Sequence, residues 1–213
     1  MFITFEGPEG SGKTSQIPPL VDFLKTQGYS VTATREPGGT EIGEQIRSVL
    51  TRLENTSMHP RTEILLFLAA RAQLVEQHIR PELARGGLVI SDRYGDATLA
   101  YQGYGHGTDL EMLRQLLNFA TGGLWPELTL LLNIDPEKGL QRKRGGVDWN
   151  RLDAYDLEFH RRVQQGYLEL SRQQPERWII IDASQTFSQV QQQIRQAIVG
   201  CLERRKTPDT NKN

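Results

Sequence analysis

Cysteine is almost absent from the sequence: Cys201 is the single one among 213 residues. One cysteine cannot form an internal disulfide, and no histidine stands at metal-site spacing from it, so a reducing, cytoplasmic location is expected. Long apolar stretches are absent as well. The longest runs, such as 64–70 and 128–132, are far too short to span a bilayer, and Met1–Phe5 lacks the basic segment that opens a secretion signal. No membrane partner is therefore expected.

An excess of either charge is missing too, because 25 lysines and arginines face 26 aspartates and glutamates. Proteins that bind nucleic-acid polymers derive much of their affinity from neutralising many phosphates, which this balance does not favour. No nucleic-acid polymer is therefore expected as a partner, and any positive field must be local. The composition is otherwise ordinary for a globular protein, with 37% hydrophobic and 24% charged residues.

Five short segments are predicted to be β-strands, and helical patterns separate them. Several of the strands are continuously apolar rather than alternating, which is typical of strands covered on both faces. Strands that alternate with helices predict a three-layer α/β fold, a five-stranded parallel sheet flanked by helices on both faces. The predicted strands are 1–6, 30–35, 87–92, 128–134 and 178–182, and the clearest helices are 41–54, 61–84, 109–121, 154–173 and 188–205. A single domain is expected over 1–206, followed by a disordered polar tail at 207–213.

The most specific motif is GPEGSGKT, which follows the first predicted strand and precedes a helical pattern. It matches the phosphate-binding loop G-x-x-x-x-G-K-[ST], whose glycines let successive backbone N–H groups turn inward and form an anion nest. The motif predicts a P-loop NTPase fold with an ATP site. Lys13 would reach the β- and γ-phosphates, and the Thr14 hydroxyl would ligate Mg²⁺. The expected ATP-binding residues are Gly7, Pro8, Glu9, Gly10, Ser11, Gly12, Lys13 and Thr14.

The third predicted strand ends in an acid, Asp92, which is followed by Arg93. An apolar strand that delivers an acid to the carboxyl edge of the sheet is how P-loop proteins place a carboxylate near the metal. Thr14 and Asp92 are therefore the candidate Mg²⁺ ligands, and Arg93 would face the same crevice. A helix-capping role is the competing interpretation of Asp92.

Basic residues recur in loops expected at this edge of the sheet: Arg35 ends the second strand, Arg93 follows the third, and a cluster lies within 138–153. Such an array suits two phosphorylated ligands that meet end to end. Phosphoryl transfer between them needs charge neutralisation more than a general base. The glycine pair 145–146 interrupts the basic segment, which predicts a lid at about 138–153 that closes over ATP. The candidates to reach the transferred phosphoryl group are Arg142, Arg144 and Arg151, and spacing does not decide among them.

With these residues in place, the chain resembles the thymidylate kinases over nearly its whole length. Three strings carry the likeness, TREPGGT (34–40), FLAAR (67–71) and DRYGDATLAYQG (92–103), and they occur with the phosphate loop and the RKRGG segment in the family's order. The resemblance implies transfer of the γ-phosphoryl group of MgATP to dTMP, giving dTDP and ADP for dTTP synthesis. No arginine lies between Gly7 and Thr14, so the chain looks like the bacterial type, in which lid arginines act on the transferred group.

The same likeness implies a binding site for dTMP. Arg35 resembles the clamp on the dTMP phosphate, and a planar guanidinium suits two-point phosphate binding. The bond between Glu36 and Pro37 is expected to be cis, as in the family. Phe67 resembles the residue that stacks on thymine, and Arg71 the one that hydrogen-bonds its edge. These two stand four residues apart, so one helical face would present an aromatic plate beside a donor.

Further positions match the family's site. Thr98 and Gln102 look like partners of the pyrimidine, Tyr101 like the residue beneath the deoxyribose, Glu9 like the acid near the 3′-hydroxyl, and Arg93 like a bridge between the two substrates' phosphates. The implied dTMP-binding set is Glu9, Arg35, Pro37, Phe67, Arg71, Arg93, Thr98, Tyr101 and Gln102. The implied catalytic set is Lys13, Arg93, Arg142, Arg144 and Arg151.

Members of the family are usually homodimers that pack through helices such as 61–83, so a homodimer is implied here. Alternatives stay open. A deoxynucleoside kinase shares the strand-ending Asp-Arg pair but phosphorylates a hydroxyl, for which it would need a carboxylate base and would not need Arg35. Another nucleoside monophosphate kinase, or a nucleotide-binding switch that hydrolyses ATP without an acceptor, would share the phosphate loop.

Overall fold

The computed structural model describes residues 1–144, 146 and 149–206. The predicted tail 207–213 and part of the predicted lid, including Gly145, lie outside the described residues. The strands are β1 (Phe2–Glu6), β2 (Val31–Arg35), β3 (Leu88–Asp92), β4 (Leu128–Asn133) and β5 (Trp178–Asp182). The helices are α1 (Lys13–Thr26), α2 (Glu41–Thr51), α3 (Pro60–Leu74), α4 (Arg80–Ala84), α5 (Gly95–Thr98), α6 (Leu110–Thr121), α7 (Pro136–Lys143), α8 (Leu157–Gln173) and α9 (Phe187–Lys206), with π-helical segments η1 (Val75–Ile79) and η2 (Leu99–Gly105).

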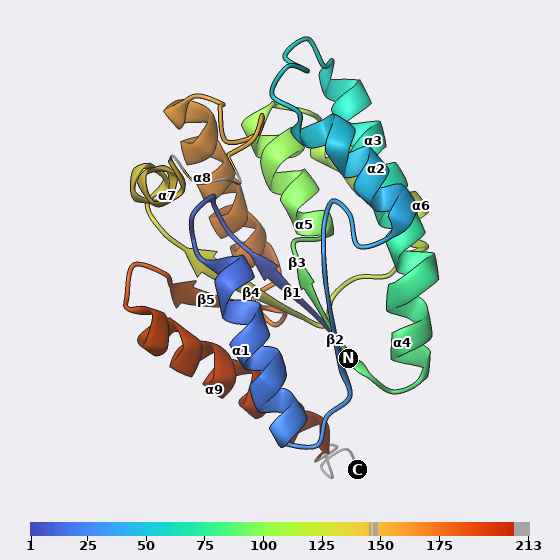
Figure 1. The fold of residues 1–213 in the computed structure, drawn as a ribbon, viewed down its shortest axis with the longest axis vertical. Coiled ribbons are helices and arrows are strands. Elements are labelled where there is room, and N and C mark those ends of the chain that lie inside the picture. Colours follow the sequence, from blue (N-terminus) through green and yellow to red (C-terminus); the bar gives the residue numbers. More distant parts are fainter. Residues whose placement is uncertain (145, 147–148, 207–213) are drawn as a thin grey trace.

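The five strands form one parallel sheet in the order β2-β3-β1-β4-β5 (Figure 1). This confirms the predicted sheet and its strands to within one or two residues. Strands β1 and β3 are buried along their whole length, which explains why they read as unbroken apolar runs. Because all strands are parallel, their carboxyl ends meet at one edge, and the loops after β1, β2 and β3 lie together there.

Side chains of the strands alternate between two layers of helices. On one face, Phe5 of β1 belongs to a buried cluster with Leu20 of α1 and Ile194 of α9. On the other, Leu131 of β4 belongs to a cluster with Tyr167 of α8. Each fully buried Leu, Ile or Phe side chain of these clusters stabilises the fold by roughly 1.5–3 kcal/mol relative to an exposed one. Figure 1 shows α1 and α9 together on one side of the sheet and the α3–α4 stretch on the opposite side, as three layers require.

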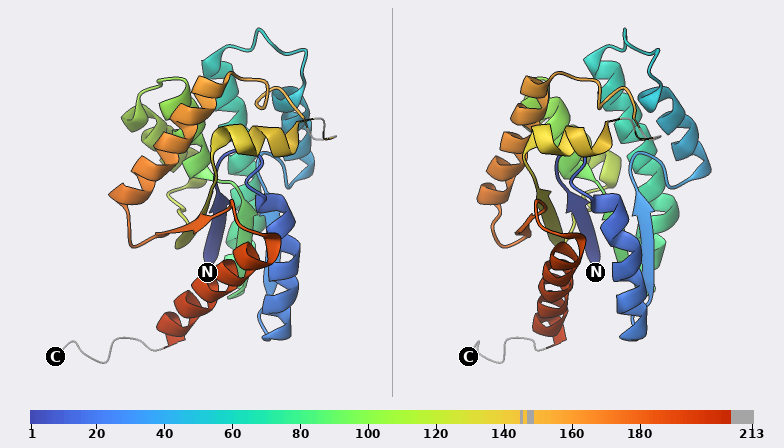
Figure 2. Two further views of the ribbon diagram at one scale, coloured as in Figure 1. Left: turned by 90° about the vertical axis from the view of Figure 1, so that its left-hand side faces the viewer. Right: turned by 60° about the vertical axis from the view of Figure 1, so that its left-hand side comes forward.

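The helices match the sequence patterns in part. The predicted helix 61–84 exists, but it is made of α3, the π-helical η1 and α4. The predicted start at 154 is wrong: α8 begins at Leu157 because the Asp156 carboxylate accepts a hydrogen bond from Phe159 N (2.7 Å) and caps the helix. Helical residues 95–105 were not predicted. Figure 2 shows α7 lying across the carboxyl ends of the strands, above the loop that follows β1. Within the described residues, no helix is long and apolar enough to cross a bilayer.

Candidate active site

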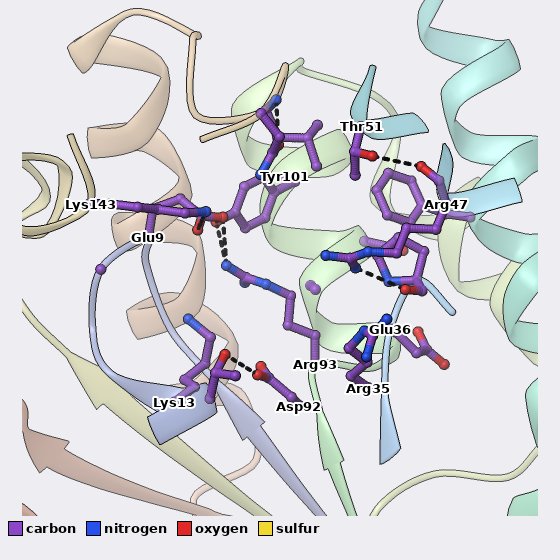
Figure 3. A pocket seen from close by; sticks show the side chains of 18 of the residues that line it. Glu9, Lys13, Arg35, Glu36, Arg47, Thr51, Asp92, Arg93, Tyr101 and Lys143 are labelled. Carbon is purple, nitrogen blue, oxygen red and sulfur yellow. Dashed lines mark hydrogen bonds and ion pairs between the residues drawn. The ribbon is translucent and has the colours of Figure 1, made fainter. Parts of the chain in front are cut away.

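A cavity of about 800 Å³ opens at the carboxyl ends of β1, β2 and β3 (Figure 3). Its wall combines the phosphate loop, the end of β2, one face of α3, the segment η2 and the end of α7. The predicted residues that line it are Glu9, Gly10, Gly12, Lys13, Thr14, Arg35, Pro37, Phe67, Arg71, Asp92, Arg93, Thr98, Tyr101, Gln102 and Arg142. Most of the predicted residues therefore line one cavity. Some lie on the wall formed by the phosphate loop, here called the donor side, and others on the wall formed by α3 and η2, here called the acceptor side.

The phosphate loop has the backbone conformation that its glycines predict. Gly7, Gly10 and Gly12 have φ values of 142°, 68° and 88°, which only glycine adopts readily. Space is a second reason for glycine, because a Cβ on Gly7 would lie 2.3 Å from the carbonyl oxygen of Leu132. Gly12 is also the residue before α1, so the first backbone N–H groups of that helix face the loop. A nest of this kind binds phosphate.

Lys13 turns back into the loop. Its Nζ donates to Gly7 O (3.0 Å), Pro8 O (2.9 Å) and Ser11 Oγ (3.0 Å). Burial, together with the charge of Arg93, lowers the pKa of Lys13 to about 8. A buried ammonium group held only by neutral oxygens gains from an anionic ligand, because a phosphate would compensate its charge. Pro8 and Ser11 therefore contribute to the loop by holding the lysine, although neither lines the cavity.

Thr14 and Asp92 are adjacent, as expected of two ligands of one metal. Thr14 Oγ1 donates to Asp92 Oδ2 at 2.5 Å. Hydroxyl and carboxylate oxygens are the hard ligands that Mg²⁺ prefers, and Mg²⁺ is commonly held by one or two carboxylates together with substrate phosphates and water. Among the described residues, no group of three or more His, Cys, Asp or Glu side chains is arranged so that it could hold a metal ion. The pair therefore fits a metal that arrives with a nucleotide.

Arg93 lies at the centre of the site. Its Nη1 donates to Gly7 O (3.0 Å) and Tyr167 OH (3.0 Å), and its Nη2 to Glu9 Oε1 (2.6 Å) (Figure 3). Its φ is 69°, the left-handed conformation that costs a non-glycine residue on the order of 1 kcal/mol. The guanidinium thereby connects the phosphate loop with Tyr101, whose hydroxyl accepts a further hydrogen bond from Nη2 (3.1 Å).

Glu9 neutralises two cations at once. Besides Arg93, its second oxygen accepts from Lys143 Nζ of α7 (2.9 Å), and Tyr101 OH donates to its first (2.9 Å). Burial alone would raise the pKa of Glu9, but the charges of Arg93, Lys143 and Lys13 hold it well below its usual range. Glu9 is therefore a charged acid between donor and acceptor sides.

The segment predicted to be a lid begins with α7 and returns at 149–153. Lys143 Nζ lies 2.6 Å from Asp153 Oδ1, so it ties the two ends together. Arg142 lines the cavity and donates to Ala183 O (2.9 Å), whereas Arg144 follows α7 as an exposed residue. Arg151 departs from the expectation. It lies outside the cavity and is buried. Its Nε donates a hydrogen bond to Leu50 O (3.0 Å), and its Nη2 lies 2.5 Å from Glu63 Oε2.

The acceptor side holds the aromatic and the donor predicted for a base. Phe67 and Arg71 both lie on α3 and line the cavity. Arg71 is fully buried and donates to Glu36 Oε2 (2.7 Å), Thr98 Oγ1 (2.9 Å) and Tyr94 O (3.1 Å). Its position is thus fixed by contacts from β2's end and from α5.

The end of β2 forms the outer rim of this side. The bond Glu36–Pro37 is cis, as expected. Arg35 is half-exposed, and its Nη2 lies 2.9 Å from both carboxylate oxygens of Glu44. Arg47 of α2 donates to Pro37 O (2.9 Å). Two cationic residues, Arg35 and Arg47, therefore line the cavity at this end (Figure 3).

Several residues of the site were not predicted. Glu36, Arg47, Lys143, Asn150 and Leu152 also line the cavity. Glu36 lies between the arginine and the proline of TREPGGT, so this string was the signal that could have identified it. Lys143 was visible in the basic segment, but nothing in its spacing indicates a partner at Glu9, which is 134 positions away.

The family model described as thymidylate kinase matches residues 5–194. Among curated relatives, the thymidylate kinase of Roseiflexus castenholzii is 52% identical over 207 residues, covering 91% of this chain and 90% of that protein. The thymidylate kinase of Desulfosudis oleivorans is 45% identical over the whole of both chains. The crystal structure of thymidylate kinase from Ehrlichia chaffeensis superposes with a TM-score of 0.76 at 33% identity, covering 93% of this chain and 98% of that one.

These likenesses cover the sheet, the phosphate loop and the acceptor side alike, and they agree with the strings that first indicated the family. A match to the family model over residues 5–194 includes every residue that lines the cavity. The chain therefore belongs to the thymidylate kinase family, whose fold is that of the P-loop NTPases.

Proposed function

We propose that this cavity transfers the γ-phosphoryl group of MgATP to dTMP, giving ADP and dTDP. One observation carries the proposal: the phosphate loop and the Phe67–Arg71 face of α3 open into the same cavity, and Arg93 stands between them. A donor held by the loop and an acceptor held by α3 would meet at this arginine. The product would serve the synthesis of dTTP.

The acceptor needs no general base. A phosphate monoester has its second pKa at about 6 and is already nucleophilic near neutral pH. We assign the dTMP phosphate to the rim at Arg35 and Arg47, its base to Phe67 and Arg71, and its sugar to Tyr101. Arg35 must leave Glu44 for this purpose. Their pair is largely exposed and therefore weak, so the cost of breaking it is small.

The transfer balances without a covalent enzyme intermediate. An oxygen of the dTMP phosphate forms the new bond to the γ-phosphorus, and the bond from that phosphorus to the β–γ bridging oxygen breaks. ADP leaves with the electron pair. Lys13 and Arg93 neutralise the charge on the moving group, and Thr14 and Asp92 would hold Mg²⁺, which supplies further charge neutralisation when bound.

The lid's role follows from where its cations lie. Arg142 lines the cavity and Arg144 stands two residues further along the chain, so these two are best placed to reach the donor's phosphates. Arg151 forms an ion pair with Glu63 instead, and so attaches the returning end of the predicted lid to α3. This differs from the sequence-based expectation, which gave all three arginines the same task.

A homodimer is proposed from the family and from α2 and α3, which expose Ile42, Val49 and Leu65. Sedimentation velocity of the protein and of a Leu65→Glu variant tests it. A monomeric parent protein would contradict it.

The function is tested by a coupled ADP-release assay with dTMP, dUMP, dCMP, dGMP, AMP and thymidine as acceptors. We expect the highest kcat/KM with dTMP. Preference for thymidine would identify a deoxynucleoside kinase, and ADP release at the same rate without any acceptor would identify an ATPase switch.

A further inference from the structure

Glu63 is a buried carboxylate beneath the acceptor side of the cavity, and no role has been assigned to it above. It lies in the first turn of α3, and its side chain is 2% exposed. Its Oε1 accepts from Gln102 Nε2 of η2 at 2.8 Å. Its Oε2 lies 2.5 Å from Arg151 Nη2 and accepts from Tyr155 OH at 3.1 Å. One carboxylate thus joins the acceptor pocket to the far end of the lid.

This carboxylate remains ionised in the folded protein. Burial on its own would raise the pKa of Glu63, but contacts with His106, Gln102 and Arg151 lower it to about 2. An ionised carboxylate only accepts hydrogen bonds. The group of Gln102 that faces Glu63 must therefore be its NH₂, whichever way the amide is drawn.

The orientation of Gln102 follows. With its nitrogen held by Glu63, the carbonyl oxygen Oε1 is turned to the other side. Among the residues that the structure describes, none donates a hydrogen bond to Oε1. Gln102 lines the same cavity as Phe67 and Arg71. An acceptor without a donor is thereby offered to whatever base lies against Phe67.

We propose that Glu63 determines base specificity by positioning Gln102: it holds the amide nitrogen, so that the amide oxygen accepts a hydrogen bond from pyrimidine N3. Thymine and uracil carry a hydrogen on N3, whereas cytosine presents a lone pair there, which would leave two acceptors facing each other. Desolvated polar groups left unpaired in this way give strong rejection of the wrong ligand. The inference rests on the proposed function, in which the base lies beside Phe67 and Arg71.

The substitution Glu63→Gln tests this directly. Arg151 and Tyr155 both donate toward Oε2, so the introduced amide must give its oxygen to them and its NH₂ to Gln102. Gln102 then has to reverse, presenting its own NH₂ to the base. We expect the ratio of kcat/KM for dTMP over dCMP to fall by at least about tenfold, through KM rather than kcat. The ratio of dTMP over dUMP stays unchanged, because both bases carry the N3 hydrogen.

The matched control is Tyr155→Phe, which removes a hydrogen bond to the same carboxylate but leaves it charged. The dTMP over dCMP ratio of this variant stays at the parent value.

A buried cation without its partner is destabilising, so the single Glu63 variant could fail to fold. The double variant Glu63→Met/Arg151→Met then carries the test, because apolar residues replace the whole ion pair. Gln102 is no longer held, and the same ratio falls by about tenfold without reversing.

Two failures are distinguishable. If the parent protein shows no preference for dTMP over dCMP, or no activity with dTMP, the proposed function fails. If the parent prefers dTMP and a folded Glu63→Gln variant, or the double variant, keeps the parent ratio, Glu63 does not set the orientation of Gln102 and the inference is overturned. Circular dichroism and thermal unfolding establish that each variant is folded before its ratio is read.

Discussion

Glu9 Oε1 lies 2.6 Å from Arg93 Nη2, and Glu9 Oε2 lies 2.9 Å from Lys143 Nζ. An acid in the phosphate loop therefore holds two cations that come from different elements, the end of β3 and the end of α7. Arg93 also donates to Gly7 O, and Lys143 also lies 2.6 Å from Asp153 Oδ1, so Glu9 adds a charged contact to partners that each cation already has. The pairings fix where positive charge stands before ATP and dTMP enter.

This arrangement predicts the effect of Glu9→Gln. The amide cannot neutralise Arg93 and Lys143, so both are held less firmly by their remaining partners, while the net positive charge of the site rises. We expect kcat to fall by about 10- to 100-fold, since misplacement of a charge-stabilising group is costly, and KM for ATP to stay level or decrease. The control is Glu54→Gln, an exposed acid whose partner is Arg52. Steady-state kinetics with both substrates measures the effect, and an unchanged kcat would argue against a positioning role for Glu9.

The pKa of Lys13 predicts how ATP binding depends on pH. Lys13 must be protonated to meet phosphate, and burial lowers its pKa to about 8 in the unliganded protein. As pH rises through about 8, the free protein loses this charge, so affinity for ATP must weaken on the alkaline side and stay level below about pH 7. Titration of a non-hydrolysable ATP analogue between about pH 6 and 10 measures it.

The control for that titration is Lys13→Arg, because arginine stays protonated throughout this range. Its binding is expected to lose the alkaline decline even if its affinity differs. A decline that persists in the variant would point to Glu6, whose pKa burial and Asp96 raise to about 8. Glu6 is fully buried and touches Tyr167, which in turn contacts Arg93.

Phe67 is predicted to bind the acceptor and not the donor. Loss of a stacking partner costs roughly 1–3 kcal/mol per base, which corresponds to about 5- to 150-fold in affinity. Phe67→Ala should therefore raise KM for dTMP within that range and leave KM for ATP unchanged. Phe119→Ala is the matched control, because it removes the same ring from α6, where Phe119 is 90% exposed. Equal effects of the two variants on KM for dTMP would show that the base lies elsewhere.

The sequence predicted the strands and the phosphate loop because their signals are local. The buried strands are unbroken apolar runs, and the loop's glycines need a left-handed backbone wherever they occur. The helical stretch 95–105 gave no such signal, since it is interrupted by glycines that serve tertiary packing. Gly105, for example, stands where a Cβ would lie 2.6 Å from the Phe159 ring. Only the neighbouring α8 explains that position.

The polar partners within the site were equally hidden. Glu63 and Arg151 are 88 positions apart, and each looks like an ordinary surface charge in the sequence. Their meeting depends on how α3 and the end of the lid are placed by the sheet. For this reason the basic segment predicted the same task for Arg151 and Arg142, and only the structure separates the two.

Helix α7 packs closely against the phosphate loop, and this contact can be tested. Gly139 of α7 faces Glu9 backbone to backbone: a Cβ on Gly139 would lie 2.2 Å from Glu9 O, and a Cβ on Gly10 would lie 1.9 Å from Gly139 O. Backbone atoms cannot yield as a flexible side chain can, so Gly139→Ala must push α7 away from the loop. Lys143 then loses its contact with Glu9, and Arg142 moves away from the cavity.

We expect this variant to lower kcat by about tenfold or more while its melting temperature stays near that of the parent. Alanine favours a helix by about 1 kcal/mol over glycine, which offsets part of the strain. Gly200→Ala in α9 is the matched control: the nearest atom to its Cβ would be Arg204 Nη1 at 3.7 Å, so the helix gains stability and kcat does not change. Thermal unfolding and ADP-release kinetics on both variants separate the two effects. A normal kcat in Gly139→Ala would mean that transfer does not require α7 to sit against the phosphate loop.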